Sequence, residues 1–157
     1  MRIFSMRSST LKFSLLLILS VVALSSLIIL VPSANDAAAA TNVSYSGVYS
    51  NEDRIAFISK FGWTVERDPV EEVEITIPAA FDASFSEYNE IQRAQGLDLE
   101  KYRGDTATKF TYGVTNYSGY DGAVYIHLIV FDNKIIGGDV SSADVNGFIY
   151  GFSGSAA

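Results

Sequence analysis

The sequence predicts an α+β domain in which an antiparallel sheet of about five strands carries two helices on one face. Three features predict this class: two segments have apolar residues at helical spacing, two alternate between apolar and polar residues, and turn residues separate short apolar runs near the C-terminus. The expected order is α-β-β-α-β-β-β, which is typical of a sheet with helices packed on it. A hydrophobic N-terminal helix is expected to precede this domain.

The first half of the domain is expected to form a helix followed by a hairpin. Ser50 is placed to cap a helix with an acidic first turn, and Gly62 is expected to end it. A short strand is expected over residues 63–67. Residues 72–77 then alternate between apolar and polar side chains, which is typical of a strand with one buried face. The residues expected on that face are Val73, Ile75 and Ile77.

A second helix is expected between Pro78 and Gly96. Its apolar residues recur at i, i+4, i+7 and i+10, which places them on one helical face. Ser84 and Glu87 have the spacing of a capping box at its start. The residues of the apolar face are Phe81, Phe85, Tyr88 and Ile91.

Three strands are expected after this helix. Residues 109–114 alternate, and residues 123–131 are apolar on both faces, which predicts a central strand. Asp132-Asn133 is expected to form a two-residue hairpin turn, because both residue types tolerate positive φ. Residues 134–138 are expected to return as the next strand. The aromatic residues between 148 and 152 are expected to pack on the core.

The N-terminus has the features of an export signal. Residues 1–12 are basic, and the 19 residues from 13 to 31 are all apolar or serine. As a helix, this run would span about 28 Å, close to the ~30 Å hydrocarbon core of a bilayer. Ala38-Ala39-Ala40 matches a signal-peptide cleavage site. Two alternatives stay open: residues 1–40 are a cleaved signal peptide, or residues 13–31 remain as a membrane anchor.

Both alternatives place the rest of the chain outside the cytoplasm, because the basic flank stays inside. The protein is therefore expected to be secreted, or tethered to the outer face of the cytoplasmic membrane. The expected organisation after the export segment is a linker over 41–49, one domain over 50–152 and a frayed tail over 153–157.

The composition of the exported part excludes several kinds of partner and site. Arg2, Arg7, Lys12 and Asp36 precede residue 41, so 8 of the 11 basic and 17 of the 18 acidic residues follow it, a net charge of −9. Such a surface repels phosphate backbones, so nucleic acid is not an expected partner. Contact with a membrane is expected only through residues 13–31. The chain has no cysteine, which excludes disulfides, thiolate metal sites and a lipid-modified cysteine.

Gly137-Gly138-Asp139 is the most distinctive motif. Glycines at the end of a strand allow a bulge or the close approach of another backbone, which gives the motif a structural interpretation. The functional interpretation is a small ligand-binding site in the following turn. Its candidate residues are Asp139, Ser142 and Asp144. The acids after Gly138 lack the spacing of a calcium loop, so neither a metal nor a cofactor is expected.

No catalytic residue is predicted. His127 is the only histidine, and a lone histidine on a strand is typical of a structural position. No serine lies in a Gly-x-Ser-x-Gly sequence, the arrangement that exposes a nucleophilic serine. The glutamates of residues 71–74 are expected to form a solvated strand face. Several tyrosines, Tyr125 among them, could line a groove for a sugar or a peptide.

Several blocks of the sequence resemble an uncharacterised family of small exported bacterial proteins, the domain of unknown function 4830. These blocks are "FGWTVE", "VEITIPAAFDASFSEYNEIQRAQGLDLEKYRG", "YGVTNY" and "IIGGDVSSADVNGFIYGF", and the resemblance covers roughly residues 51–152. The resemblance implies that Gly137-Gly138-Asp139 belongs to the pattern of the family. It implies no activity and no catalytic residue.

Three functional hypotheses follow. The first is a non-catalytic binding or interaction domain outside the cytoplasm, whose partner is a protein, peptide or glycan of the cell surface. The second is a small hydrolase that uses the acids near Asp139 and Asp144. The third is a structural or regulatory domain tethered to the membrane by residues 13–31.

Overall fold

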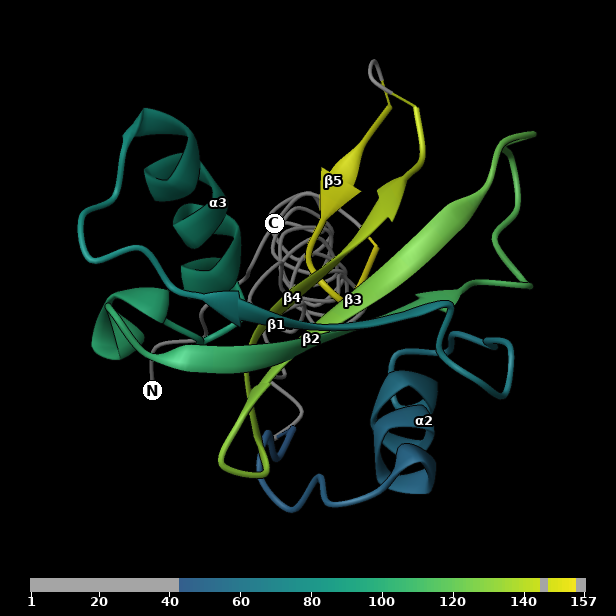
Figure 1. Ribbon diagram of the computed structural model, residues 1–157. Coiled ribbons are helices and arrows are strands. Elements are labelled where there is room, and N and C mark those ends of the chain that lie inside the picture. The colour runs from purple at the N-terminus through teal and green to yellow at the C-terminus, as the bar shows by residue number, and fades with distance from the viewer. Residues whose placement is uncertain (1–42, 145–146, 155–157) are drawn as a thin grey trace, which may run out of the picture. The chain divides into compact units, whose positions relative to one another are not determined.

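The computed structural model describes residues 43–144 and 147–154 (Figure 1). The elements in chain order are α2 (Asn51–Ser59), β1 (Glu71–Thr76), α3 (Ala83–Ala94), the 3-10 helix η2 (Leu99–Tyr102), β2 (Thr106–Gly113), β3 (Val124–Phe131), β4 (Lys134–Ser142) and β5 (Ile149–Tyr150). The predicted export segment, with its hydrophobic helix, lies outside the described residues. Within the described ranges, no helix has the length and apolar character that crossing a bilayer requires.

The five strands form one antiparallel sheet in the order β1-β2-β3-β4-β5. Each strand pairs with its neighbour in the sequence, and β3 lies at the centre. This arrangement confirms the predicted α+β class, the five antiparallel strands and the central position of the segment that is apolar on both faces.

The order of the elements differs from the prediction at two places. Residues 63–67 form a single bridge, between Val65 and Val114, instead of a strand. The fifth strand is β5, which lies within the aromatic segment near the C-terminus. The observed order is therefore α-β-α-β-β-β-β, with the 3-10 helix before β2.

The prediction that both helices lie on one face of the sheet is wrong. Leu128 belongs to the core cluster that contains Phe57 of α2, whereas the next residue, Ile129, belongs to a second cluster, against which Phe85 of α3 packs. Successive side chains of a strand point to opposite faces, so α2 and α3 cover opposite sides of the sheet. Figure 1 shows α3 on one side of the strands and α2 on the other. Because β3 is apolar on both faces, each face needs a covering layer.

The cap of α2 is the one that the sequence predicts. The Ser50 hydroxyl accepts a hydrogen bond from the Asp53 N–H, and the Asp53 carboxylate accepts one from the Ser50 N–H in return. The cap of α3 differs from the prediction. Asp82 accepts a hydrogen bond from the Phe85 N–H at 2.8 Å, so the helix begins before the predicted Ser84–Glu87 box.

Strand β1 is more exposed than its alternating pattern predicts. It lies at the edge of the sheet, and Val73 is 38% exposed, while Ile77 just after the strand is buried. The predicted buried face is therefore complete only at the C-terminal end of β1.

The predicted strand end at Gly137-Gly138-Asp139 is wrong, because β4 continues through these residues to Ser142. The predicted bulge is present: the register shifts so that Ile129 pairs with Gly137 and Val130 with Ile135. The predicted close approach of other atoms to a glycine is present as well, at Gly138. A Cβ atom on Gly138 would lie 2.2 Å from the His127 carbonyl oxygen and 2.5 Å from Cζ of Phe152.

Two side chains at the C-terminal end of α3 bond to the backbone of Gly138 in β4. β5 pairs only with Val140 and Ser141, so it does not reach Gly138. Gln92 Oε1 accepts a hydrogen bond from the Gly138 N–H at 2.8 Å, and Gln95 Nε2 donates one to the Gly138 carbonyl oxygen at 3.1 Å. Two glutamine side chains thus replace the partner strand.

The described part of the predicted linker packs on the domain. Val48 is buried, and the Tyr45 ring lies 5.7 Å from the Phe57 ring. The Ile135 N–H donates to the Tyr45 carbonyl oxygen. Residues 43–49 therefore belong to the folded unit.

Candidate functional site

A row of polar side chains crosses the face of the sheet that α3 covers. Four of them lie directly opposite one another on four consecutive strands, and helix α3 and β2 each add one more. We call this set the polar row. Its members are Glu71, Thr111, His127 and Asp139 in register, with Tyr88 and Lys109 beside them.

Hydrogen bonds in the polar row place the proton of His127. Lys109 Nζ lies 2.8 Å from Glu71 Oε2 and, with the Thr111 hydroxyl, lowers the pKa of Glu71, so this carboxylate can only accept. Thr111 Oγ1 donates its one proton to Glu71 Oε2 at 3.1 Å. The oxygen of Thr111 must then accept from His127 Nδ1, which lies at 2.9 Å. Neutral His127 therefore carries its proton on Nδ1.

The other end of the polar row is a buried carboxyl group. Asp139 is 4% exposed, and its Oδ2 accepts a hydrogen bond from the Tyr88 hydroxyl at 2.9 Å. Its Oδ1 has no hydrogen-bond partner among the described residues. Burial raises the pKa of Asp139, although the charge of protonated His127 and the Tyr88 hydroxyl oppose this shift. Burial of the hydroxyl and the adjacent Asp139 raise the pKa of Tyr88.

The composition of the polar row is similar to that of a catalytic triad, but its geometry differs from one. A nucleophile must pass its proton to the histidine and must reach the substrate. Thr111 is buried and gives its proton to Glu71 instead, and no ion pair joins His127 to Asp139 among the described residues. Burial lowers the pKa of His127, which favours its neutral form. The row is suited to joining four strands and α3.

The structure does not bring Asp139, Ser142 and Asp144 together. Asp139 and Ser142 are three residues apart on β4, so their side chains point to opposite faces of the sheet. The Ser142 hydroxyl accepts a hydrogen bond from the Phe148 N–H, and Asp144 accepts one from the Tyr120 hydroxyl. The Tyr120 hydroxyl interacts with both Ser142 and Asp144, so the structure brings these two together and leaves Asp139 on the other face of the sheet. Within residues 43–144 and 147–154, no group of three or more acids or histidines could hold a metal ion.

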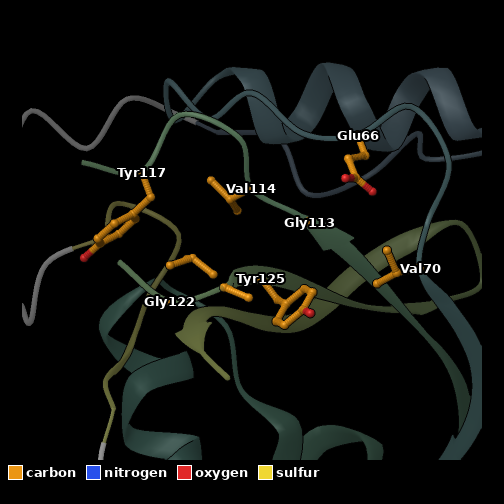
Figure 2. A pocket seen from close by; sticks show the side chains of 9 residues that line it. Glu66, Val70, Gly113, Val114, Tyr117, Gly122 and Tyr125 are labelled. Atoms are coloured by element: carbon orange, nitrogen blue, oxygen red, sulfur yellow. The ribbon is translucent and has the colours of Figure 1, made fainter. Parts of the chain in front are cut away.

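A hollow of about 240 Å³ lies between the segment before β1 and the start of β3 (Figure 2). The Glu66 side chain lies across Gly113 at the end of β2, where a Cβ atom would be in ordinary van der Waals contact with Glu66 Cδ at 3.4 Å. The Glu66 N–H donates to the Gly113 carbonyl oxygen and Gly113 pairs with Tyr125, so Glu66 and Tyr125 lie on either side of Gly113 and both line the hollow. The lining residues are Glu66, Val70, Gly113, Val114, Tyr117, Gly122, Ala123, Val124 and Tyr125.

Of the six tyrosines that the sequence suggests for a groove, Tyr117 and Tyr125 line the hollow, whereas Glu66 was not predicted. The hollow is lined by Glu66 and Val70 and by the ends of β2 and β3. No sequence motif indicates that these segments lie side by side. Their proximity depends on the backbone bonds from the Glu66 N–H to the Gly113 carbonyl and from the Val70 N–H to the Thr111 carbonyl. These contacts span more than 40 residues of the chain.

Replacing Asp139 by asparagine is expected to change how stability depends on pH. Because the pKa of Asp139 is raised in the folded state, folding takes up a proton between the unfolded pKa near ~3.9 and the folded value. The carboxyl group of Asp139 therefore lowers the free energy of unfolding more and more as pH rises through this window. Below the window it has no such effect. Urea midpoints from pH 3.5 to 8 should show Asp139→Asn gaining stability over the wild type as pH rises.

Asp121→Asn is the matched control, because it removes one negative charge at an exposed position of the turn before β3. It reports the general effect of net charge. If the two variants differ from the wild type by the same amount at every pH, Asp139 is not the buried, proton-linked group described above.

Comparisons with known proteins identify a family and no activity. Neither the curated proteins nor the solved structures contain a match to the chain. The sequence profile of one family matches residues 57–140, which include the whole polar row and every residue that lines the hollow. The match ends before Ser142, Asp144 and β5. The chain belongs to the family described as Domain of unknown function (DUF4830).

Proposed function

We propose that the protein is a non-catalytic binding domain that acts outside the cytoplasm. The observation that carries the proposal is the hollow beside Glu66 and Tyr125. It is concave, and its lining contains neither a histidine nor a serine, threonine or cysteine nucleophile. A protein, peptide or glycan of the cell surface would be the partner.

The state of the polar row supports a binding function over a hydrolase. The Thr111 hydroxyl is buried and donates its proton to Glu71, and His127 Nδ1 donates to Thr111, so Thr111 cannot pass its proton to Nδ1. The two acids suggested for hydrolysis do not face each other, because Asp139 is bound to Tyr88 and Asp144 to Tyr120. The concave surface lined by Glu66 and Tyr125 is the better site for a ligand.

A turnover and binding screen tests the proposal. The full-length chain, with a panel of glycans, peptides and esters, is expected to give no turnover and at least one ligand whose binding is lost in Tyr125→Leu. Tyr49→Leu is the matched control, because Tyr49 is 75% exposed and does not line the hollow. Turnover that a single substitution abolishes would contradict a binding function.

The apolar run of residues 13–31 favours a second candidate, a membrane-tethered structural or regulatory domain. Intact-mass measurement of the protein from its source cells, in both medium and membrane fractions, separates the two. A species that begins near Thr41 in the medium supports a free binding domain. A full-length species in the membrane supports a tethered one.

A further inference from the structure

The hollow beside Glu66 has the chemistry of a site for a positively charged group. Figure 2 shows the Glu66 side chain, Tyr125 and Val70 around the same space. A carboxylate and an aromatic ring on two sides of one hollow are complementary to a cation, which gains a charge-assisted hydrogen bond from the first and a cation–π contact from the second.

The Glu66 carboxylate is available for such a ligand. The ion pairs of the described residues use Glu71, Glu90, Asp98 and Glu100 as their acids, and Glu66 is not among them. Lys109 of β2 does not pair with Glu66, because its Nζ lies 2.8 Å from Glu71 Oε2. The net charge of −9 after residue 40 also favours the approach of a cation over that of an anion.

Of the two tyrosines in the hollow, Tyr125 offers the ring face. Tyr117 is stacked between the Trp63 and Phe148 rings, with centroids at 5.6 and 5.1 Å, so both of its faces are covered. Tyr125 has only a tilted contact with His127, at 6.4 Å, among the described aromatic pairs. A cation between Glu66 and Tyr125 would therefore meet a carboxylate and a ring.

The size and surroundings of the hollow indicate that the positively charged group belongs to a peptide. At about 240 Å³ the hollow lies below the range of about 300–1,000 Å³ that is usual for whole small ligands. Two apolar side chains of this segment are exposed: Val70, which lines the hollow, is 53% exposed, and Val73, three residues further on in β1, is 38% exposed. Strand β1, which contains Val73, lies at the edge of the sheet. A partner that fills the hollow and covers this surface must extend beyond its charged group.

We infer that the hollow binds a lysine or arginine side chain of a peptide segment whose neighbouring residues contact Val70 and Val73. This inference rests on the proposed binding function and specifies the chemistry of the partner. It names Glu66 as the residue that selects charge and Tyr125 as the residue that supplies the ring.

Calorimetric titration of the full-length chain tests the inference with three probes. They are the peptide acetyl-Thr-Val-Lys-Val-Thr-amide, the same peptide with norleucine in place of lysine, and free cadaverine. The lysine peptide is expected to bind at least about tenfold more tightly than the norleucine peptide, since a hydrogen bond to a charged group contributes about this much. Cadaverine is expected to bind about tenfold or more weakly than the lysine peptide, because it cannot contact Val70 and Val73.

Two glutamate variants give the matched comparison. Glu66→Gln is expected to weaken binding of the lysine peptide about tenfold and to leave the norleucine peptide unaffected. Glu87→Gln removes the same charge from an exposed position of α3 that does not line the hollow, and is expected to change affinity less than about twofold. The melting temperatures of both variants should stay near that of the wild type, which shows that they fold.

Several results would overturn the inference. These are equal binding of the lysine and norleucine peptides, equal effects of Glu66→Gln and Glu87→Gln, binding of cadaverine as tight as that of the lysine peptide, and no binding of either peptide. None of them contradicts the proposed binding function, which fails by turnover or by the lack of any ligand that depends on Tyr125.

Discussion

Gly138→Ala is expected to lower the free energy of unfolding by about 3 kcal/mol, near the upper end of what overpacking costs. The added Cβ atom would lie 2.2 Å from the carbonyl oxygen of His127, a backbone atom of the central strand, and 2.5 Å from the Phe152 ring. Neither neighbour can move alone, because His127 is held in the sheet and Phe152 is fully buried. The melting temperature should fall by roughly 10 °C or more.

Gly113→Ala is the matched control. It makes the same chemical change at the end of β2, where the nearest atom to the new Cβ is the flexible Glu66 side chain at 3.4 Å. Its melting temperature should lie within a few degrees of that of the wild type. If the two variants melt together, the close approach at Gly138 is not what requires a glycine.

Phe152→Ala is expected to cost about 3–5 kcal/mol of unfolding free energy, the usual range for removing a buried phenylalanine side chain. Phe152 is fully buried, and its ring lies 5.2 Å from the ring of Phe57 and 5.3 Å from that of Phe61. Its backbone is also held, because the Trp63 indole N–H donates to its carbonyl oxygen at 2.6 Å. Thermal and urea unfolding of the full-length variant would measure the loss.

Ile149→Ala is the comparison for this prediction. Ile149 also belongs to the C-terminal segment, but its side chain is 43% exposed, so its removal should cost less than about 1 kcal/mol. A small effect of both substitutions would mean that the segment is not part of the cooperative fold. A large effect of Phe152→Ala alone would mean that the fold needs residues beyond 140, where the match to the family ends.

Phe152 also supports the part of β4 that contains Asp139 of the polar row. Phe152 packs over Gly138, the residue that precedes Asp139, while Gln95 Oε1 of α3 accepts a hydrogen bond from the Phe152 N–H at 2.6 Å. The C-terminal segment therefore holds the same stretch of β4 that α3 contacts from the other side. Loss of the Phe152 ring is expected to loosen the neighbourhood of Asp139 as well as the core.

The features that depend on neighbouring residues could be predicted from the sequence. The Ser50 cap needs only the Ser50 hydroxyl and the N–H of Asp53 three residues later, and it forms as predicted. The hairpin turn needs only two residues that accept positive φ, and Asp132 and Asn133 have φ values of 47° and 57°. The central position of β3 follows from a pattern that is apolar on both faces.

The features that depend on contacts between distant segments could not be predicted from the sequence, because they follow from the tertiary fold. The polar row requires the register of four strands, in which Glu71 and Thr111 are 40 residues apart. The hollow requires Glu66 to lie across Gly113, and the burial of Asp139 requires α3 to cover β4. The side of the sheet that each helix covers was decided in the same way. Local propensity and periodicity act over a few residues, whereas a site is made where strand pairing and packing bring side chains together across the whole chain.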